Sequence, residues 1–304
     1  MAGSVTETAR QGRNALMQGK TVVITGGNTG IGKATAIALA KRGADVIFTS
    51  RNAEKGERAK AEIEAAAGRP VRLELLDLAS FPSIRSFAAR VLDSTPRIDV
   101  LVNNAGLILD RRETTAEGFE AMFGVNHLGH FLLTDLLLPR IRESAPARIV
   151  VVASDAHYRA KDGLDWDDLM STRRFRGFDV YSKSKLANVM FARELARRLE
   201  GTGVTVNAVH PGVVATEFAG KDDAKGPIGW FFRLARPFLR TPEEGADTVI
   251  FATSSPEIEG RTGRYFADRK DKAPSRHARD DAACQRLWAV SEALVERASQ
   301  AKAD

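Results

Sequence analysis

A tyrosine and a lysine four positions apart, Tyr181 and Lys185, form the pair in this sequence best suited to acid–base chemistry. Residues four apart lie on one face of a helix, so the phenol and the ammonium would be neighbours. A phenol with a pKa of about 10 is a poor base at neutral pH, and a nearby ammonium stabilises its ionised form. An exposed helical pair without a chemical role is the alternative.

Two further polar residues lie at positions where they could assist this acid–base chemistry. Ser154 ends the apolar run 150–153, and Asn126 interrupts an otherwise apolar helical pattern. The carboxyl ends of parallel strands surround the ligand crevice of such sheets, and asparagine is a poor residue for a helix interior. These positions favour functional roles, although a turn serine and a polar residue at a helix kink explain them as well.

A glycine-rich turn, Thr-Gly-Gly-Asn-Thr-Gly-Ile-Gly over residues 25–32, follows a β-branched run and precedes a helical pattern. Glycines let the backbone approach a pyrophosphate, and the helix N-terminus favours its negative charge. The spacing is G-x-x-x-G-x-G and not the commoner G-x-G-x-x-G, so the strand–turn–helix setting carries the interpretation. A plain tight turn is the alternative.

The elements that must position these residues alternate strand and helix in units of about 30 residues. Strands are predicted at 21–25, 45–49, 71–76, 98–102, 148–153 and 204–209, and helices at 33–42, 53–67, 83–92, 116–143 and 180–200. This pattern predicts an α/β fold, a single-domain doubly wound (Rossmann) parallel sheet of about seven strands with helices on both faces. Residues 1–19 are expected to form a flexible arm and 20–304 the domain. Insertions near 155–179 and 213–240, including 164–169, are expected to form a substrate rim.

Composition restricts the class of protein. The 304 residues are 43% hydrophobic and 28% charged, as in an ordinary globular protein. The net charge of +6 fits a small anionic ligand at least as well as nucleic acid, and no nucleic-acid partner is expected. No apolar run approaches the roughly 18 residues of a membrane span, and the first 18 residues lack a secretory pattern. The single cysteine, Cys284, excludes an internal disulfide and favours a reducing, cytoplasmic location. The five histidines show no metal-ligand spacing, so no metal is expected. A monomer and a homo-oligomer both remain open.

Taken together, the motifs resemble the short-chain dehydrogenase/reductase superfamily over about residues 18–266. They occur in the family's order: the glycine turn, Asn103-Asn104-Ala105-Gly106, Asn126, Ser154, Tyr181-x-x-x-Lys185 and His210-Pro211-Gly212. Segments 124–139, 181–199 and 202–217 resemble the branch that holds retinol dehydrogenases, WW-domain oxidoreductases and protochlorophyllide reductases. The chain departs from this branch in having Ala153-Ser154 where Ser-Ser is frequent, and in the 27 positions between Ser154 and Tyr181.

The resemblance implies a role for each catalytic residue. Tyr181 would be the general acid in carbonyl reduction and the base in alcohol oxidation, and Lys185 would lower its pKa and hold the nicotinamide ribose. Ser154 would bind the substrate oxygen, and Asn126 would anchor a relay water. The resemblance also assigns residues to the cofactor. The phosphates would contact Gly26, Asn28, Thr29, Gly30, Ile31 and Gly32, and the adenine would contact Asp77 and Leu78. Asn104 would lie at the adenosine ribose, with Ala105 and Gly106 also at the cofactor, and the nicotinamide carboxamide would contact Pro211, Gly212 and Thr216.

The end of the second predicted strand bears on cofactor choice. Enzymes that select NAD often have an acid there, about 20 residues after the glycine turn, but this strand ends Phe-Thr-Ser-Arg-Asn at 48–52. Arg51 offers a planar fork to a 2′-phosphate, with Ser50 as an added donor and Lys55 nearby. NADP(H) is therefore expected to be favoured over NAD(H), unless Arg51 only covers a helix terminus.

These observations predict an NADP-dependent oxidoreductase that interconverts an alcohol and an aldehyde or ketone on a small or medium, largely apolar substrate. The alternative is a non-catalytic dinucleotide-binding regulatory or scaffold protein on the same fold. A methyltransferase would leave Tyr181 and Lys185 unexplained. The aromatic segment 225–239, with Trp230 and Phe231, is interpreted as a substrate lid, and a peripheral membrane or partner contact is its alternative.

Overall fold

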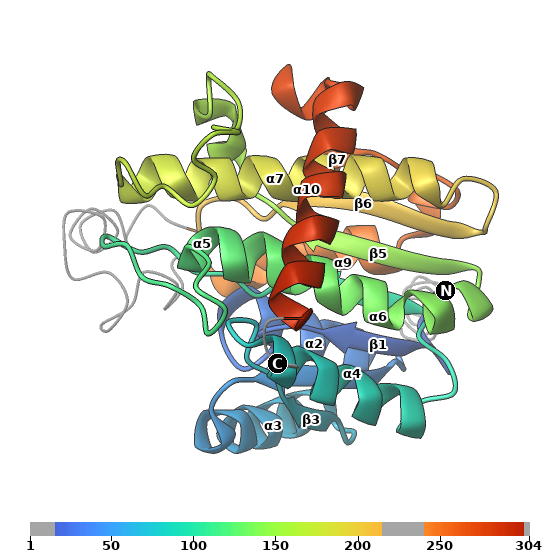
Figure 1. Cartoon of the computed structure of the whole chain (residues 1–304). Helices are drawn as coiled ribbons and strands as arrows, with labels where there is room; N and C mark the ends of the chain where they lie inside the picture. Colours follow the sequence, from blue (N-terminus) through green and yellow to red (C-terminus); the bar gives the residue numbers. More distant parts are fainter. Residues whose placement is uncertain (1–15, 215–239, 301–304) are drawn as a thin grey trace.

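The computed structural model describes residues 16–214 and 240–300. In this part of the chain, strands form one sheet in the order β3-β2-β1-β4-β5-β6-β7-β8 (Figure 1). Neighbouring strands are parallel except β7 and β8, which are antiparallel. The strands are β1 (Thr21–Ile24), β2 (Asp45–Ser50), β3 (Arg72–Leu75), β4 (Val100–Asn103), β5 (Ala147–Val152), β6 (Val204–His210), β7 (Tyr265–Ala267) and β8 (Lys270–Asp271).

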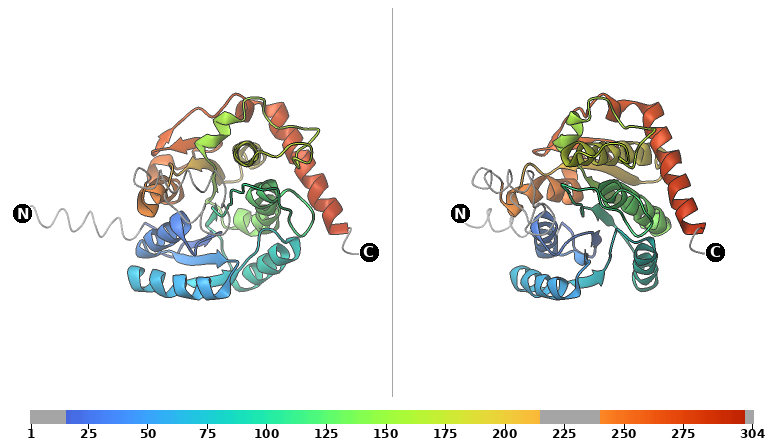
Figure 2. Two further views of the ribbon diagram at one scale, coloured as in Figure 1. Left: turned by 90° about the vertical axis from the view of Figure 1, so that its left-hand side faces the viewer. Right: turned by 60° about the vertical axis from the view of Figure 1, so that its left-hand side comes forward.

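Helices cover both faces of the sheet (Figure 2). The first layer contains α2 (Gly30–Lys41), α3 (Ala53–Ala67) and α9 (Pro242–Ser254). The second layer contains α4 (Phe81–Ser94), α6 (Gly129–Glu143) and α7 (Gly177–Arg198), with α10 (Asp281–Gln300) packed on its outer side. Shorter helices are α5 (Ala121–Phe123), η1 (Gly124–Leu128), η2 (Asp155–Arg159), η5 (Pro256–Ile258) and η6 (His277–Arg279).

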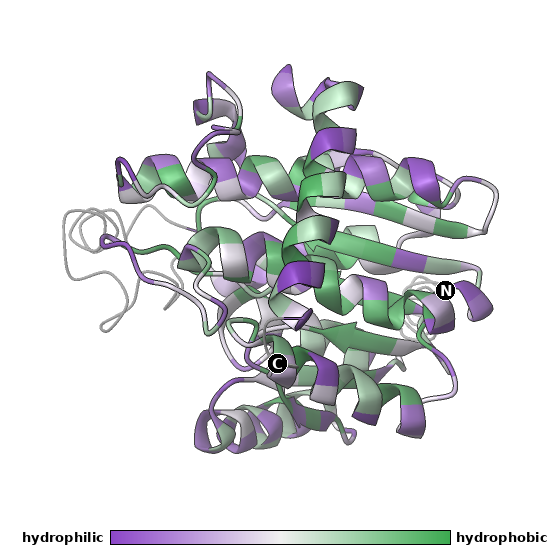
Figure 3. Ribbon diagram, in the orientation of Figure 1, coloured by the Kyte–Doolittle hydropathy of each residue, from purple (hydrophilic) through white to green (hydrophobic). Residues whose placement is uncertain are grey.

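The central strands, such as β1 and β4, are apolar on both faces because both faces are buried (Figure 3). In β1, Val22 and Ile24 pack into the cluster of the first helix layer, whereas Val23 packs into the cluster of the second. All three side chains are fully buried. This alternation is the two-residue period of a strand, and it explains why the β-branched runs of the sequence identified the central strands.

The strand order reverses between β1 and β4. From β1 the chain continues toward one edge of the sheet, through β2 and β3, and from β4 it continues toward the other edge, through β5 and β6. Connections leaving such adjacent strands diverge and open a crevice at their carboxyl ends. The chain leaves β1 into the glycine-rich turn and leaves β4 into Asn104, so the fold brings the two motifs to this crevice. The doubly wound fold expected from the sequence is confirmed.

Three details differ from the sequence predictions. The sheet has an eighth strand, because β8 is a two-residue antiparallel edge strand too short to leave a periodic signal. Met17 lies in the expected arm, yet it is buried against the first helix layer. The helix expected at 116–143 begins at Ala121, because Glu120 caps it by accepting the N–H groups of Met122 and Phe123 at 2.9 and 2.7 Å. It then passes through a π-helical turn, η1, before α6.

Candidate active site

A cavity of about 970 Å³ opens at the carboxyl ends of the central strands. It gathers residues from the glycine turn, the ends of the strands and the Tyr181–Lys185 pair, which lie up to about 190 positions apart in the chain. The predicted residues that line it are Gly26, Asn28, Thr29, Gly30, Ile31, Gly32, Ser50, Arg51, Asp77, Leu78, Asn104, Ala105, Gly106, Ser154, Tyr181, Lys185, Pro211 and Gly212. Thr216, Trp230 and Phe231 lie outside the described residues, as does most of the 213–240 insertion.

The glycine turn connects β1 to α2, and its backbone is packed so closely that a side chain would not fit at Gly32. Gly26 has a φ of +64°, which favours glycine, and a Cβ at Gly32 would lie 2.3 Å from the Gly26 carbonyl oxygen. In the described part of the chain, the Thr29 side chain makes no capping bond to α2, whereas Asn52 and Ser80 cap α3 and α4. The first N–H groups of α2 therefore face the cavity without a side-chain cap, and this arrangement fits the phosphates of a dinucleotide.

Thr25, which the sequence analysis did not single out, joins this turn to β4. Its Oγ1 accepts the N–H groups of Asn104 and Ala105, each at 2.9 Å, and the Asn104 side chain donates to the Thr25 carbonyl at 2.7 Å. A fully buried threonine hydroxyl thus fixes the backbone of the Asn104–Gly106 segment at the cavity wall.

His130 extends this network to the opposite helix layer. Its Nδ1 lies 3.2 Å from the carbonyl oxygen of Asn126, and its Nε2 lies 2.9 Å from Thr25 Oγ1. Burial, assisted by the charge of Lys185, lowers the pKa of His130 to about 4, so the ring is neutral at pH 7. A carbonyl oxygen only accepts, so Nδ1 carries the proton and the Thr25 hydroxyl donates to Nε2. Only its place four residues after Asn126 could have indicated this contact.

Asn126 itself is fully buried and is the described candidate residue that does not line the cavity. Its side chain accepts from the N–H of Leu107 at 2.8 Å and donates to the Leu107 carbonyl and to Ser184 Oγ, both at 3.0 Å. It lies in the π-helical turn η1, where an irregular ladder tolerates an asparagine. Asn126 therefore joins the segment after β4 to α7, the helix that carries Tyr181.

Ser154, Tyr181 and Lys185 meet at the wall of the cavity. The side chains of Ser154 and Tyr181 are hydrogen-bonded to each other. Ser154 Oγ also accepts the Ala156 N–H at 3.1 Å, because Ser154 is the N-cap of η2. Lys185 Nζ donates to the Val152 carbonyl at 3.1 Å and lies 5.7 Å from the centre of the Tyr181 ring. The helical spacing of four thus brings phenol and ammonium together, as the sequence predicted.

Burial dominates the electrostatics of this group. The side chain of Lys185 is only 2% exposed, and burial lowers its pKa to about 8. Burial also raises the pKa of Tyr181 above its usual value, while the Ser154 hydrogen bond lowers it in part. The sequence analysis expected Lys185 to lower the pKa of Tyr181. In this structure burial raises that pKa, and the lowering contribution comes from Ser154 and not from Lys185. The phenol keeps its proton at neutral pH.

The end of β2 presents basic residues to the cavity. Arg51, Asn52 and Lys55 line it and are exposed. Ser50 was expected as an added donor, but its Oγ donates to the Asn52 carbonyl at 2.8 Å and the residue is buried. Asp77, after β3, also lines the cavity, and its Oδ1 accepts the Ala79 N–H at 2.9 Å. Arg51 and Lys55 are therefore the basic side chains at this edge.

The 155–179 insertion contributes to the cavity wall through its two ends. Asp155, Ala156, Arg159 and Phe178 line the cavity. Residues 164–169, also expected at the rim, are not among the described lining residues, and Trp166 instead stacks with Arg286 of α10 at 4.4 Å. Leu164 belongs to the main core cluster and Trp166 and Leu169 pack against it, which explains the apolar residues of this stretch without a contact to substrate. No described helix is both long and apolar enough to cross a membrane.

Comparison with known proteins agrees with the motifs. The short chain dehydrogenase family matches residues 20–165 and 168–226. Retinol dehydrogenase 12 of Homo sapiens is 47% identical over 292 residues, which cover 95% of this chain and 89% of that protein. Retinol dehydrogenase 14 of Homo sapiens is 45% identical over 301 residues, 94% of this chain and 89% of that protein. The predicted resemblance to retinol dehydrogenases is confirmed.

Solved structures show the same fold. A crystal structure of an uncharacterized protein from Mycobacterium Paratuberculosis has a TM-score of 0.73 and 34% identity, covering 92% of this chain and 94% of that one. The Pseudomonas aeruginosa RhlG/NADP active-site complex has a TM-score of 0.65 and 26% identity, covering 83% and 96%. The family match, the relatives and the fold agree, and the chain belongs to the short-chain dehydrogenase/reductase family of oxidoreductases.

Proposed function

We propose that this protein interconverts an aldehyde or ketone and its alcohol with NADP(H), and that Tyr181 transfers the proton. The observation that carries the proposal is the group of Ser154, Tyr181 and Lys185 on the wall of a cavity large enough for a dinucleotide and a substrate. A protein that only bound a dinucleotide would have no chemical need for a buried lysine beside this tyrosine.

The residues fit a nicotinamide dinucleotide, which when bound supplies or accepts the hydride. The glycine turn and the uncapped end of α2 would hold its phosphates, Asp77, Leu78 and Asn104 its adenosine, and Lys185, Pro211 and Gly212 its nicotinamide end. Thr216 is proposed at the same end from its sequence motif.

In carbonyl reduction the substrate oxygen gains negative charge and needs a proton. The Tyr181 phenol is protonated at neutral pH and is hydrogen-bonded to Ser154, so one oxygen can contact both hydroxyls. The Lys185 ammonium, largely charged below about pH 8, stabilises the phenolate that remains after proton transfer. In alcohol oxidation the same groups act in reverse.

The substrate class follows from the wall beyond Tyr181. Leu107, Ile108, Phe178 and Val213 line the cavity, the first three in one apolar cluster with Tyr181, and they favour an apolar molecule. The names of the relatives point to retinol, so retinol and its aldehyde are the first compounds of this class to try. A small or medium apolar aldehyde is the general substrate that we propose.

NADP(H) is proposed over NAD(H) because the β2 edge carries Arg51 and Lys55 on the cavity. No acid lines the cavity among residues 48–55. A carboxylate there would repel a 2′-phosphate, and a guanidinium pairs with it.

The test is a panel of aldehydes and ketones, including the aldehyde of retinol, followed by the loss of NADPH absorbance. Turnover of apolar aldehydes by the wild-type protein and its loss in Tyr181→Phe are the expected results. Tight binding of NADPH without turnover of any compound would instead support the non-catalytic dinucleotide-binding protein.

A cytoplasmic location is also proposed, since the single cysteine, Cys284, is buried and needs no oxidising compartment. Fractionation of cells that express the full chain tests it, and recovery in a secreted fraction would contradict it.

A further inference from the structure

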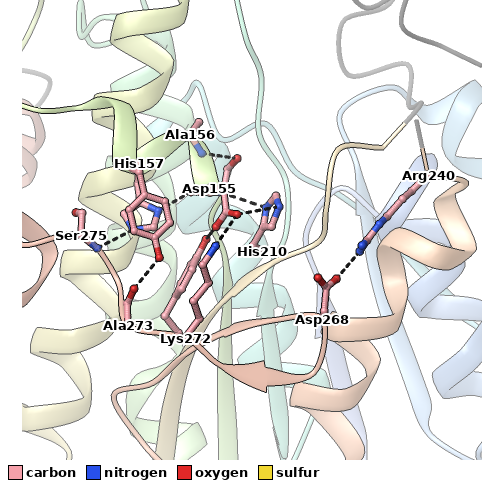
Figure 4. Close-up of polar contacts among 12 residues, drawn as sticks. Asp155, Ala156, His157, His210, Arg240, Asp268, Lys272, Ala273 and Ser275 are labelled. Carbon is pink, nitrogen blue, oxygen red and sulfur yellow. Dashed lines mark hydrogen bonds and ion pairs between the residues drawn. The ribbon is translucent and has the colours of Figure 1, made fainter. Parts of the chain in front are cut away.

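Asp155, the residue after Ser154, connects three strands at the cavity wall. Its Oδ1 accepts from the hydroxyl of Tyr265 on β7 at 2.8 Å, and its Oδ2 accepts from Lys272 Nζ at 2.9 Å. Its backbone N–H donates to Nδ1 of His210, the last residue of β6, at 3.2 Å. Figure 4 shows His210 and Lys272 pointing toward Asp155 from different segments. A single residue thus joins the end of β5 to β6 and to the antiparallel pair β7–β8 with the residues that follow it to 275, called here the C-terminal hairpin.

A second contact fixes the backbone of Ser154 to the same hairpin region. His157 Nδ1 lies 2.7 Å from the Ser154 carbonyl, and its Nε2 accepts the N–H of Ser275 at 3.1 Å (Figure 4). These partners require a proton on Nδ1 and none on Nε2, which is a neutral ring. Burial lowers the pKa of His157 and favours that state. Ser154 is thus tied to residues 272–275 on both sides.

His210 transmits the contact to the nicotinamide end of the site. Because its Nδ1 accepts from Asp155, the ring proton is on Nε2, which lies 3.7 Å from Asp155 Oδ2. Pro211 and Gly212 follow His210 directly and line the cavity. A shift of Asp155 would therefore move Ser154 and the Pro211–Gly212 segment together.

The charge of Asp155 is compensated within this cluster. Burial alone would raise the pKa of Asp155, but the hydrogen bond from Lys272 and the nearby His210 and Tyr265 leave it below its usual value. The same pair raises the pKa of Lys272. An ionised carboxylate and an ammonium are thus present together at neutral pH, and a charge-assisted hydrogen bond of this kind is directional.

We propose that Asp155 is a positioning residue for carbonyl reduction, which through Lys272 and Tyr265 holds Ser154 against Tyr181 and sets the Pro211–Gly212 segment. This rests on the proposed function. The C-terminal hairpin becomes in this way part of the support of the active site. Small errors in such positions cost large factors in rate.

The main variant is Asp155→Asn, which keeps the shape and removes the charge that Lys272 contacts. We expect kcat for an aldehyde with NADPH to fall about tenfold or more while the Kd for NADPH changes less than about threefold. Lys272→Met and Tyr265→Phe should each cause a smaller loss. Lys272→Arg keeps a cationic donor and should restore most of the activity that Lys272→Met loses.

The matched control is Asp247→Asn, which removes an acid that pairs with the same hairpin. Arg269 Nε donates to Asp247 Oδ2 at 2.6 Å, and neither residue lines the cavity in the described part of the chain. We expect its kcat to equal that of the wild type. An Asp155→Asn enzyme with more than half of the wild-type kcat, or with a loss no larger than that of Asp247→Asn, would overturn the proposal.

A second measurement does not depend on turnover. The chain has three tyrosines, so a ¹³Cζ-tyrosine label gives a spectrum in which Tyr181 can be assigned by Tyr181→Phe. Loosening of the Ser154–Tyr181 bond in Asp155→Asn should shift the Tyr181 resonance, and Asp247→Asn should leave it in place. An unshifted resonance overturns the positioning role even if the protein reduces no carbonyl, whereas a shifted resonance without wild-type turnover contradicts only the proposed function.

Discussion

The two ends of the cavity are built in different ways. At the reactive end, Lys185 and Asn126 are buried, and each is bonded to backbone from another element. At the β2 edge, Arg51 and Lys55 are long, exposed side chains on the cavity wall. The reactive end is therefore fixed before any ligand binds, whereas the β2 edge acts through charge. Substitutions at the first should change the rate, and substitutions at the second should change the choice of cofactor.

The sharpest test of the reactive end is Tyr181→Phe. The ring still packs against Phe178, at 6.1 Å between ring centres, while the oxygen bonded to Ser154 is lost. We expect kcat to fall by about 10²–10⁴-fold, the usual contribution of a general acid, with the Kd for NADPH within about twofold of the wild type. A variant that kept more than about a tenth of the wild-type kcat would show that another group donates the proton.

The lowered pKa of Lys185 predicts that cofactor capture depends on pH. Burial lowers its pKa to about 8, so the free enzyme carries the ammonium below that pH and the neutral amine above it. Because the charged form is the one proposed to hold the cofactor ribose, kcat/KM for NADPH should fall as the pH rises through about 8. This quantity reports groups of the free enzyme.

Lys185→Arg provides the control for this profile, since a guanidinium stays charged over the whole range. Its lower activity should not decline further near pH 8. A wild-type profile that stays level from pH 7 to well above 8 would mean that the charge of Lys185 is not needed for cofactor capture.

The same comparison explains what could be predicted from the sequence. Tyr181 and Lys185 were found because helical spacing is local, and the glycine turn because its neighbours are a strand and a helix. Thr25, His130 and Lys272 were missed because their hydrogen-bond partners are far away in the sequence. Thr25 and Asn104 are 79 positions apart, His130 and Thr25 are 105 apart, and Lys272 and Asp155 are 117 apart. Only the folded chain brings such pairs together. The burial that sets the pKa of Tyr181 is likewise a property of the whole fold.

Thr25→Val tests whether the long-range network is needed between the two ends. The valine keeps the shape but leaves the Ala105 N–H without its buried acceptor, and leaves the Asn104 N–H with the Val102 carbonyl alone. An unsatisfied buried group costs about 1–3 kcal/mol, so the free energy of unfolding should fall by that order. The Kd for NADPH should rise as well, because this segment lines the cavity.

The matched control is Thr35→Val on α2. Thr35 is fully buried, and its hydroxyl has no hydrogen-bond partner among the described residues. Its replacement should leave stability unchanged or raise it, as measured by urea unfolding. Equal effects of the two variants would mean that the Thr25 hydroxyl contributes nothing beyond its volume.

The smallest expected effect concerns the β2 edge. Arg51 is exposed at the end of β2 and lines the cavity together with Lys55, and none of the acids among residues 48–55 lines it. We expect a preference for NADPH over NADH of about tenfold, which corresponds to about 1.4 kcal/mol of phosphate binding. Arg51→Ala should remove most of this preference by raising the KM for NADPH while leaving NADH-supported turnover intact. Arg58→Ala, which removes an exposed charge from α3 that is not among the described residues lining the cavity, should leave the ratio unchanged. Equal use of both cofactors by the wild type, or a ratio that Arg51→Ala leaves untouched, would show that the two ends do not divide rate and selectivity in this way.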